Sequence, residues 1–133
     1  MKNLFQVLLA AFLCSLLLSC SNEAPGKMDP RFGEIQEVLD KSCVRSECHY
    51  GVDVESRLDL REGHAYENLV SQQSGQVEDM LLIDPGSAEN SYLVRKLEGG
   101  KIVGDQMPLG RKPLGADTIL AIRKWINDGA ENN

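Results

Sequence analysis

Two cysteines and a histidine lie close together in the first half of the chain, in the order Cys43, Cys48 and His49. Thiols and imidazoles bind transition metals, form disulfides and attach haem covalently. In a covalent haem site two thiols add to the vinyl groups of the porphyrin, and the histidine after the second cysteine is thereby held beneath the iron. The spacer between these cysteines is four residues long rather than the usual two, so this string alone is equally consistent with a disulfide.

A zinc site is a third possibility, because four ligands of suitable type are available: Cys43, Cys48, His49 and His64. Zinc motifs usually pair their ligands over shorter gaps, which disfavours this interpretation. His64 is also a possible axial ligand for a haem iron. We expect it instead to be an exposed residue at the start of a helix.

A methionine far downstream of His49 has the right surroundings for a second iron ligand. Met107 is followed by Pro108 and lies in a glycine-rich segment, residues 98–115, that predicts no regular structure. Core methionines usually lie on helix faces, whereas long irregular segments in compact domains are usually functional. A thioether on a loop that wraps around the domain is what a sixth iron ligand requires, so we expect Met107 in that role.

The spacing of apolar residues predicts a mostly α domain, residues 30–133, with long ordered loops. We expect extended chain over residues 57–61 and a short buried run over residues 80–83. The first predicted helix covers residues 30–42, with Asp29 as its N-cap, and a short second helix covers residues 65–70. A third helix is capped by Ser87 and carries Tyr92, Leu93 and Leu97. The last helix carries Ile119, Ile122, Trp125 and Ile126 and is closed by Asp128 and Gly129.

The first residues predict export. Lys2 precedes an apolar run, residues 4–18, that is short for a bilayer span and suits a signal peptide. The run ends in Leu17-Leu18-Ser19-Cys20, which resembles the lipobox of bacterial lipoproteins. We therefore predict a signal peptide over residues 1–19, a lipid anchor on Cys20 and a polar tether over residues 20–29. An ordinary secretory signal is the alternative.

This address implies the bacterial cell envelope, with the protein lipid-anchored and either facing the periplasm or on the outer membrane. Because the compartment is oxidising, a free cysteine pair should not persist there. Cys43 and Cys48 are therefore expected to form a disulfide, bind a metal or attach a cofactor.

Composition limits the partners. The chain has 133 residues, 42% hydrophobic and 26% charged, which is typical of one globular domain, and its net charge of −6 disfavours nucleic acid as a partner. Aromatic residues make up only 5%, so a staple or a bound cofactor is expected to complete the core.

Charge is unevenly distributed along the chain. Residues 20–89 carry 6 basic and 15 acidic side chains, whereas residues 90–124 carry 7 basic and 3 acidic ones. Because complementary charge steers weakly docking redox proteins, we hypothesise that the basic segment receives an acidic partner; a merely solvated surface is the alternative. The basic residues around Met107 are Arg95, Lys96, Lys101, Arg111 and Lys112.

The mature chain resembles a monohaem cytochrome-c-like domain of the kind abundant in planctomycetes and related bacteria. The resemblance covers roughly residues 35–130. The matching motifs, in order, are Cys43…Cys48-His49, Leu58-Asp59-Leu60, Asp84-Pro85-Gly86 with Ser91-Tyr92-Leu93, Met107-Pro108-Leu109-Gly110, and a final stretch with Ile122, Trp125, Gly129 and Ala130.

The resemblance implies one covalent haem c on Cys43 and Cys48, with His49 as the proximal iron ligand and Met107 as the distal one. It also implies that Leu58, Leu60 and Trp125 pack on the haem. Iron with six ligands has no position open for substrate, so the implied role is electron transfer between redox proteins rather than enzymatic catalysis. The rival interpretation is a haem-free structural or binding lipoprotein with a Cys43–Cys48 disulfide; a catalytic haem protein is a weaker third.

Overall fold

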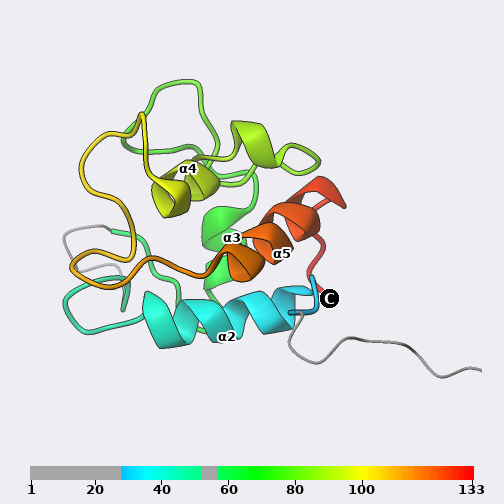
Figure 1. Ribbon diagram of the computed structural model, residues 1–133, viewed down its shortest axis with the longest axis horizontal. Helices are drawn as coiled ribbons and strands as arrows, with labels where there is room; N and C mark the ends of the chain where they lie inside the picture. Colours follow the sequence, from blue (N-terminus) through cyan, green and yellow to red (C-terminus); the bar gives the residue numbers. More distant parts are fainter. Residues whose placement is uncertain (1–27, 52–56) are drawn as a thin grey trace, which may run out of the picture.

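A computed structural model describes residues 28–51 and 57–133 of the chain. The predicted signal peptide, Cys20 and nearly all of the tether therefore lie outside the described residues. The elements are α2 (Phe32–Ser42), α3 (Ala65–Leu69), the 3-10 helix η1 (Ala88–Asn90), α4 (Tyr92–Glu98) and α5 (Ala116–Asn127) (Figure 1). The predicted mostly α class is confirmed. Within the described residues, no helix is both long and apolar enough to cross a membrane.

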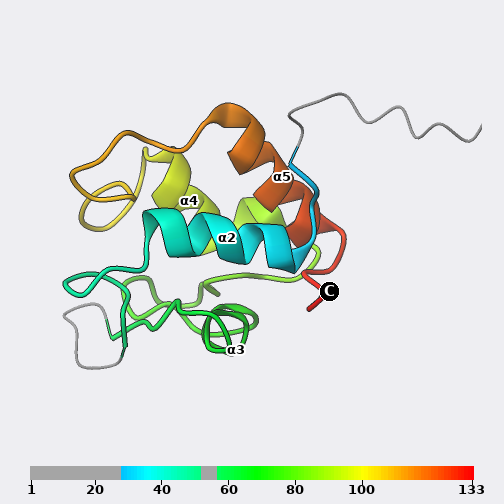
Figure 2. The same ribbon diagram turned by 90° about the horizontal axis from the view of Figure 1, so that it is seen from below.

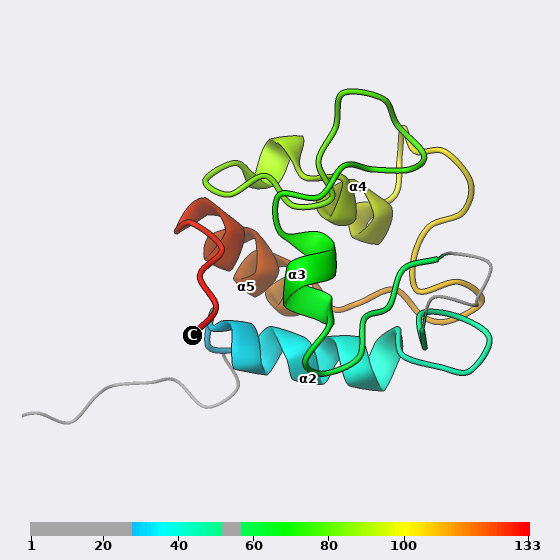
Figure 3. The same ribbon diagram turned by 180° about the vertical axis from the view of Figure 1, so that it is seen from behind.

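Helices α2 and α5 lie one above the other, and α4 packs against α5 (Figures 1 and 2). Seen from behind, α3 lies in front of α5 and above α2 (Figure 3). Three aromatic rings join these elements. The ring of Phe32 on α2 lies 5.1 Å from the Tyr66 ring on α3 and 5.5 Å from the Trp125 ring on α5, measured between centroids. Tyr66 also donates a hydrogen bond from its hydroxyl to the carbonyl of Ala130, which ties the last turn of chain to α3.

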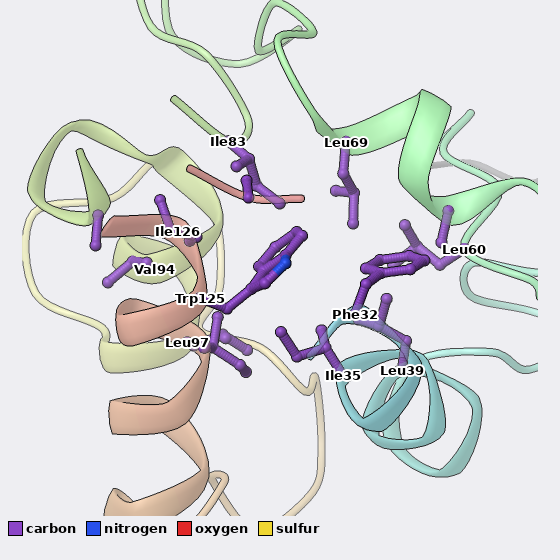
Figure 4. Packing of buried hydrophobic residues seen from close by; sticks show 14 residues of the cluster. Phe32, Ile35, Leu39, Leu60, Leu69, Ile83, Val94, Leu97, Trp125 and Ile126 are labelled. Carbon is purple, nitrogen blue, oxygen red and sulfur yellow. The ribbon is translucent and has the colours of Figure 1, made fainter. Parts of the chain in front are cut away.

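The hydrophobic core lies between these helices, with Trp125 near its centre (Figure 4). The Trp125 side chain is almost fully buried, and its indole N–H donates a 2.8 Å hydrogen bond to the carbonyl of Glu131. A buried indole N–H needs a hydrogen-bond partner, so this bond lets the largest core residue pack without leaving its N–H group unsatisfied. The other labelled core residues are Phe32, Ile35, Leu39, Leu60, Leu69, Ile83, Val94, Leu97 and Ile126.

The first helix starts later than predicted. It begins at Phe32 rather than residue 30, and Arg31, not Asp29, is its N-cap residue. The Asp29 carboxylate instead accepts a hydrogen bond from the Arg31 guanidinium. The exposed N–H groups of the first turn are satisfied by Asn133, whose side-chain oxygen accepts from Phe32 N at 3.0 Å. A cap supplied from so far along the chain leaves no local sequence pattern.

The third predicted helix is divided in two. Ser87 precedes η1, and Ser91 precedes α4. The Ser91 hydroxyl donates to the carbonyl of Ser87 and accepts from the backbone N–H of Asp84, which fixes the bend between the two elements. The short second helix and the last helix agree with prediction, and Gly129, at φ 112°, follows the C-cap Asp128 of α5.

Two connections run beside the helices. Residues 70–74 and 80–83 approach each other through isolated bridges, Val70 with Ile83 and Gln73 with Leu81. Residues 57–61 form no helix or strand, and Arg57 has a left-handed φ of 50°, so the predicted extended chain is not confirmed at its first residue. Asp59 is buried, and Arg61 binds its carboxylate through two nitrogens. Residues 99–115 contain no helix or strand, which confirms the long irregular segment.

Candidate functional site

A cavity of about 700 Å³ brings together residues from distant parts of the chain. Cys43, His49 and Met107 all line it, and so do Leu58 and Leu60. Most of the apolar wall comes from α3, α4 and the chain between them, a contribution that we did not predict. The remaining leucines of the wall are Leu69, Leu82, Leu93 and Leu97.

The His49 imidazole is oriented by a backbone carbonyl. Its Nδ1 atom lies 3.1 Å from the carbonyl oxygen of Leu58. A carbonyl only accepts hydrogen bonds, so Nδ1 carries the proton and Nε2 keeps its lone pair in the neutral ring. Burial, together with the positive charge of Lys96, lowers the pKa of His49, although the bond to Leu58 acts in the opposite direction. The imidazole therefore has the neutral form that ligates metals.

Backbone hydrogen bonds fix the chain around His49. The N–H of His49 donates to the carbonyl of Cys43 at 3.3 Å, and the N–H of Leu60 donates to the carbonyl of His49 at 3.0 Å. The N–H of Cys48 bonds to the carbonyl of Arg45 at 2.9 Å, so part of the four-residue spacer is folded as a turn. The long spacer thus returns the chain to Cys43 and places His49 beside it.

The two cysteines have different surroundings. Cys43 lines the cavity, whereas Cys48 is half-buried in the turn before His49 and is not part of the lining. No disulfide joins them in the described part of the chain. Burial raises the pKa of the Cys43 thiol to about 11, despite the opposing effect of Arg111. The Cys43 side chain is therefore a neutral thiol at ordinary pH.

Met107 is held at the cavity by bonds on both sides of it. Its backbone N–H donates to the carbonyl of Lys96 at 2.8 Å, and the neighbouring Gln106 amide donates to the carbonyl of Leu97. Farther along, Arg111 donates to the carbonyls of Lys41 and Ser42 at the end of α2. The irregular segment is therefore anchored to α4 and to the residue before Cys43.

Two residues considered from the sequence, Trp125 and His64, lie away from the cavity lining. Trp125 is in the core, not among the lining residues, so its predicted packing on a haem stays a prediction. His64 is exposed before α3, as expected. Among residues 28–51 and 57–133, no three His, Cys, Asp or Glu side chains converge as a metal site, so nothing there supports the zinc alternative.

Lys96 differs from the other basic residues around Met107 in its burial. It was grouped with four other cations around Met107, but its side chain is only 9% exposed and lines the cavity. Position 96 falls on the same helix face as Leu93 and Leu97, which is the face that α4 turns inward. Lys101, Arg111 and Lys112 are exposed, as expected.

No family model, curated protein or solved structure matches this chain.

The donor set and the cavity fit a covalent haem c. A thiol, an imidazole with a free Nε2 lone pair and a thioether line one space, and these are the groups that attach the porphyrin and ligate its iron. The second thiol, that of Cys48, immediately precedes the imidazole in the chain. Leucines supply the apolar wall, and the volume lies within the usual range of cofactor pockets.

Proposed function

We propose that this protein is a membrane-tethered c-type cytochrome that carries single electrons through one covalent haem. The observation that carries the proposal is the meeting of Cys43, His49 and Met107 at one cavity, although Met107 is far from the others in sequence. A methionine without a role at the site would not be expected to lie at the same cavity as Cys43 and His49. The four-residue spacer, which weakened the motif, is accommodated by a turn.

Each residue has a distinct role in this proposal. Cys43 and Cys48 would hold the haem through thioethers, and His49 and Met107 would ligate its iron. When bound, the haem iron supplies one-electron chemistry by alternating between its ferric and ferrous states. The Leu58 carbonyl keeps Nε2 of His49 available, and the leucine wall excludes water. Because two side chains of this chain would ligate the iron, no position would stay open for substrate, and the residues favour electron transfer over catalysis.

The cellular setting completes the proposal. The lipobox predicts that Cys20 anchors the protein in the bacterial cell envelope, facing the periplasm or on the outer membrane. Exposed cations lie on both sides of Met107 in the irregular segment and suit an acidic redox partner that docks weakly: Lys101, Arg111 and Lys112. Electron transfer with such a partner should slow as ionic strength rises.

Expression of the full chain with a c-type haem maturation system tests the proposal. We expect a band that stains for haem on a denaturing gel and sharp reduced α and β absorption bands. The double variant Cys43→Ser, Cys48→Ser should lose the stain, whereas Cys14→Ser, in the predicted signal peptide, should keep it. A colourless protein whose mass contains a Cys43–Cys48 disulfide would instead identify a haem-free lipoprotein.

A further inference from the structure

Lys96 is a buried cation without a matching anion. Its side chain is nine-tenths buried, and its ammonium Nζ donates a 3.0 Å hydrogen bond to the carbonyl of Val103. None of the ion pairs among the described residues includes Lys96. Asp105 acts on it only at longer range than an ion pair. Removing an ammonium group from water is costly unless a negative charge compensates it, so this arrangement calls for an anion.

The place where that anion would lie is the cavity. Lys96 lines it together with Tyr92, and Nζ lies 6.0 Å from the centre of the Tyr92 ring. The Tyr92 hydroxyl accepts from the N–H of Val103 at 3.2 Å, which holds the carbonyl partner of Lys96 in position. The hydrogen bond from Lys96 to the Val103 carbonyl restrains the ammonium group at the cavity wall instead of letting it extend into solvent.

A second donor borders the same space. The Gln76 side chain also lines the cavity, and its oxygen accepts a hydrogen bond from the Tyr92 hydroxyl. Both Nε2 of Gln76 and Nζ of Lys96 lie 3.8 Å from the point where a Cβ on Gly104 would stand. An ammonium and an amide N–H₂ that both lie near one point offer a carboxylate two hydrogen-bond donors.

We propose that Lys96, assisted by Gln76, binds a carboxylate of the porphyrin that occupies this cavity. This inference rests on the proposed haem function, because that function supplies a ligand that is apolar over most of its surface and carries carboxylates at one edge. The leucine wall suits the apolar part, and Lys96 provides the charge that the carboxylate edge requires. Lys96 is thus a specificity-determining residue for the cofactor and lies outside the docking surface.

Reversible porphyrin binding to the full chain provides the test. In the Cys43→Ser, Cys48→Ser background no thioether forms, and metal-free protoporphyrin IX needs neither His49 nor Met107 as a ligand. We expect Lys96→Met to weaken its binding about thirtyfold or more, as expected when a largely buried, hydrogen-bonded charge pair loses one partner. Binding of protoporphyrin IX dimethyl ester, which has no free carboxylate, should not change. Lys96→Arg should retain binding, and Lys101→Met, which removes an exposed charge from the same segment, is the matched control.

The outcomes separate this inference from the proposed function. If Lys96→Met weakens the binding of both porphyrins equally, or of neither, the proposed carboxylate contact is overturned. Haem staining of the wild-type protein still decides the proposed function in that case. Failure of protoporphyrin IX to bind the background protein also overturns the proposed contact. Thermal unfolding of each variant, with Lys96→Arg as the conservative change, shows whether a loss of binding reflects a loss of fold.

Discussion

The backbone N–H of Met107 donates a 2.8 Å hydrogen bond to the carbonyl of Lys96, the residue that lines the cavity from α4. The bond makes the position of a loop methionine depend on a helix rather than on its own flexible neighbours. Arg111 fixes the other side of the segment through the carbonyls of Lys41 and Ser42. The segment can therefore present the thioether in one place without regular secondary structure of its own.

Replacement of Met107 by alanine tests its role as an axial ligand. In the haem-loaded protein, Met107→Ala should alter the sharp reduced α and β bands, because one axial side chain is lost. Met80→Ala is the matched control: Met80 is buried but does not line the cavity. It should keep the spectrum while lowering the free energy of unfolding by about 2–5 kcal/mol. An unchanged spectrum in Met107→Ala would exclude the methionine as a ligand.

Two residues on helix α5 allow the contribution of the core to the free energy of unfolding to be measured. Ile126 is fully buried beside Trp125, whereas Leu120 on the same helix is 61% exposed. Ile126→Ala removes packed methylene groups and leaves a cavity, so it should lower the free energy of unfolding by about 2–5 kcal/mol. Leu120→Ala should change it by less than about 0.5 kcal/mol. Denaturant unfolding of both variants provides the comparison, and equal losses would mean that α5 does not pack as described.

Local patterns predicted the helices well because their apolar residues recur at the right spacing. The last helix and the short second one agree with prediction, since each buries the residues that its periodicity places on one face. The first helix began later because Asn133, from the other end of the chain, caps it. The third was divided because the Ser91 hydroxyl bonds Ser87 and Asp84 across a bend. Tertiary hydrogen bonds of this kind leave little trace in a sequence.

From the sequence, only the site residues with distinctive side-chain chemistry could be predicted. Cys43, His49 and Met107 are rare residue types in informative surroundings, and their meeting at one cavity agrees with that pattern. Leu93 and Leu97 gave a weaker signal, because their spacing predicts a buried face but not what lies against it. Lys96 was misplaced because a lysine in sequence predicts exposure. Only the burial of the inward face of α4 shows that its ammonium group lines a cavity.

The ion pair between Asp59 and Arg61 should make stability depend on pH. The Arg61 guanidinium and backbone N–H hold the pKa of the buried Asp59 carboxyl well below its usual range. A lowered carboxyl pKa contributes stability that is complete above the unfolded value of about 3.9 and is lost as the pH falls towards the folded value. Asp59→Asn should therefore lower the Tm most above pH 5, with the difference from wild type closing towards pH 2. Asp117→Asn, an exposed change, should leave the pH profile as it is; the same closing gap there would contradict the assignment to Asp59.

The thiol of Cys43 should react slowly in haem-free protein. Burial raises its pKa to about 11, against about 8.5 for an unfolded cysteine, and only the thiolate reacts with iodoacetamide. At pH 8 the native chain should therefore be alkylated at Cys43 about 200-fold more slowly than the same chain in denaturant. The native rate should rise about tenfold per pH unit until close to pH 11. Peptide mass mapping distinguishes Cys43 from the other cysteines, and a native rate that levels off near pH 8.5 would show that Cys43 is not enclosed by the cavity wall.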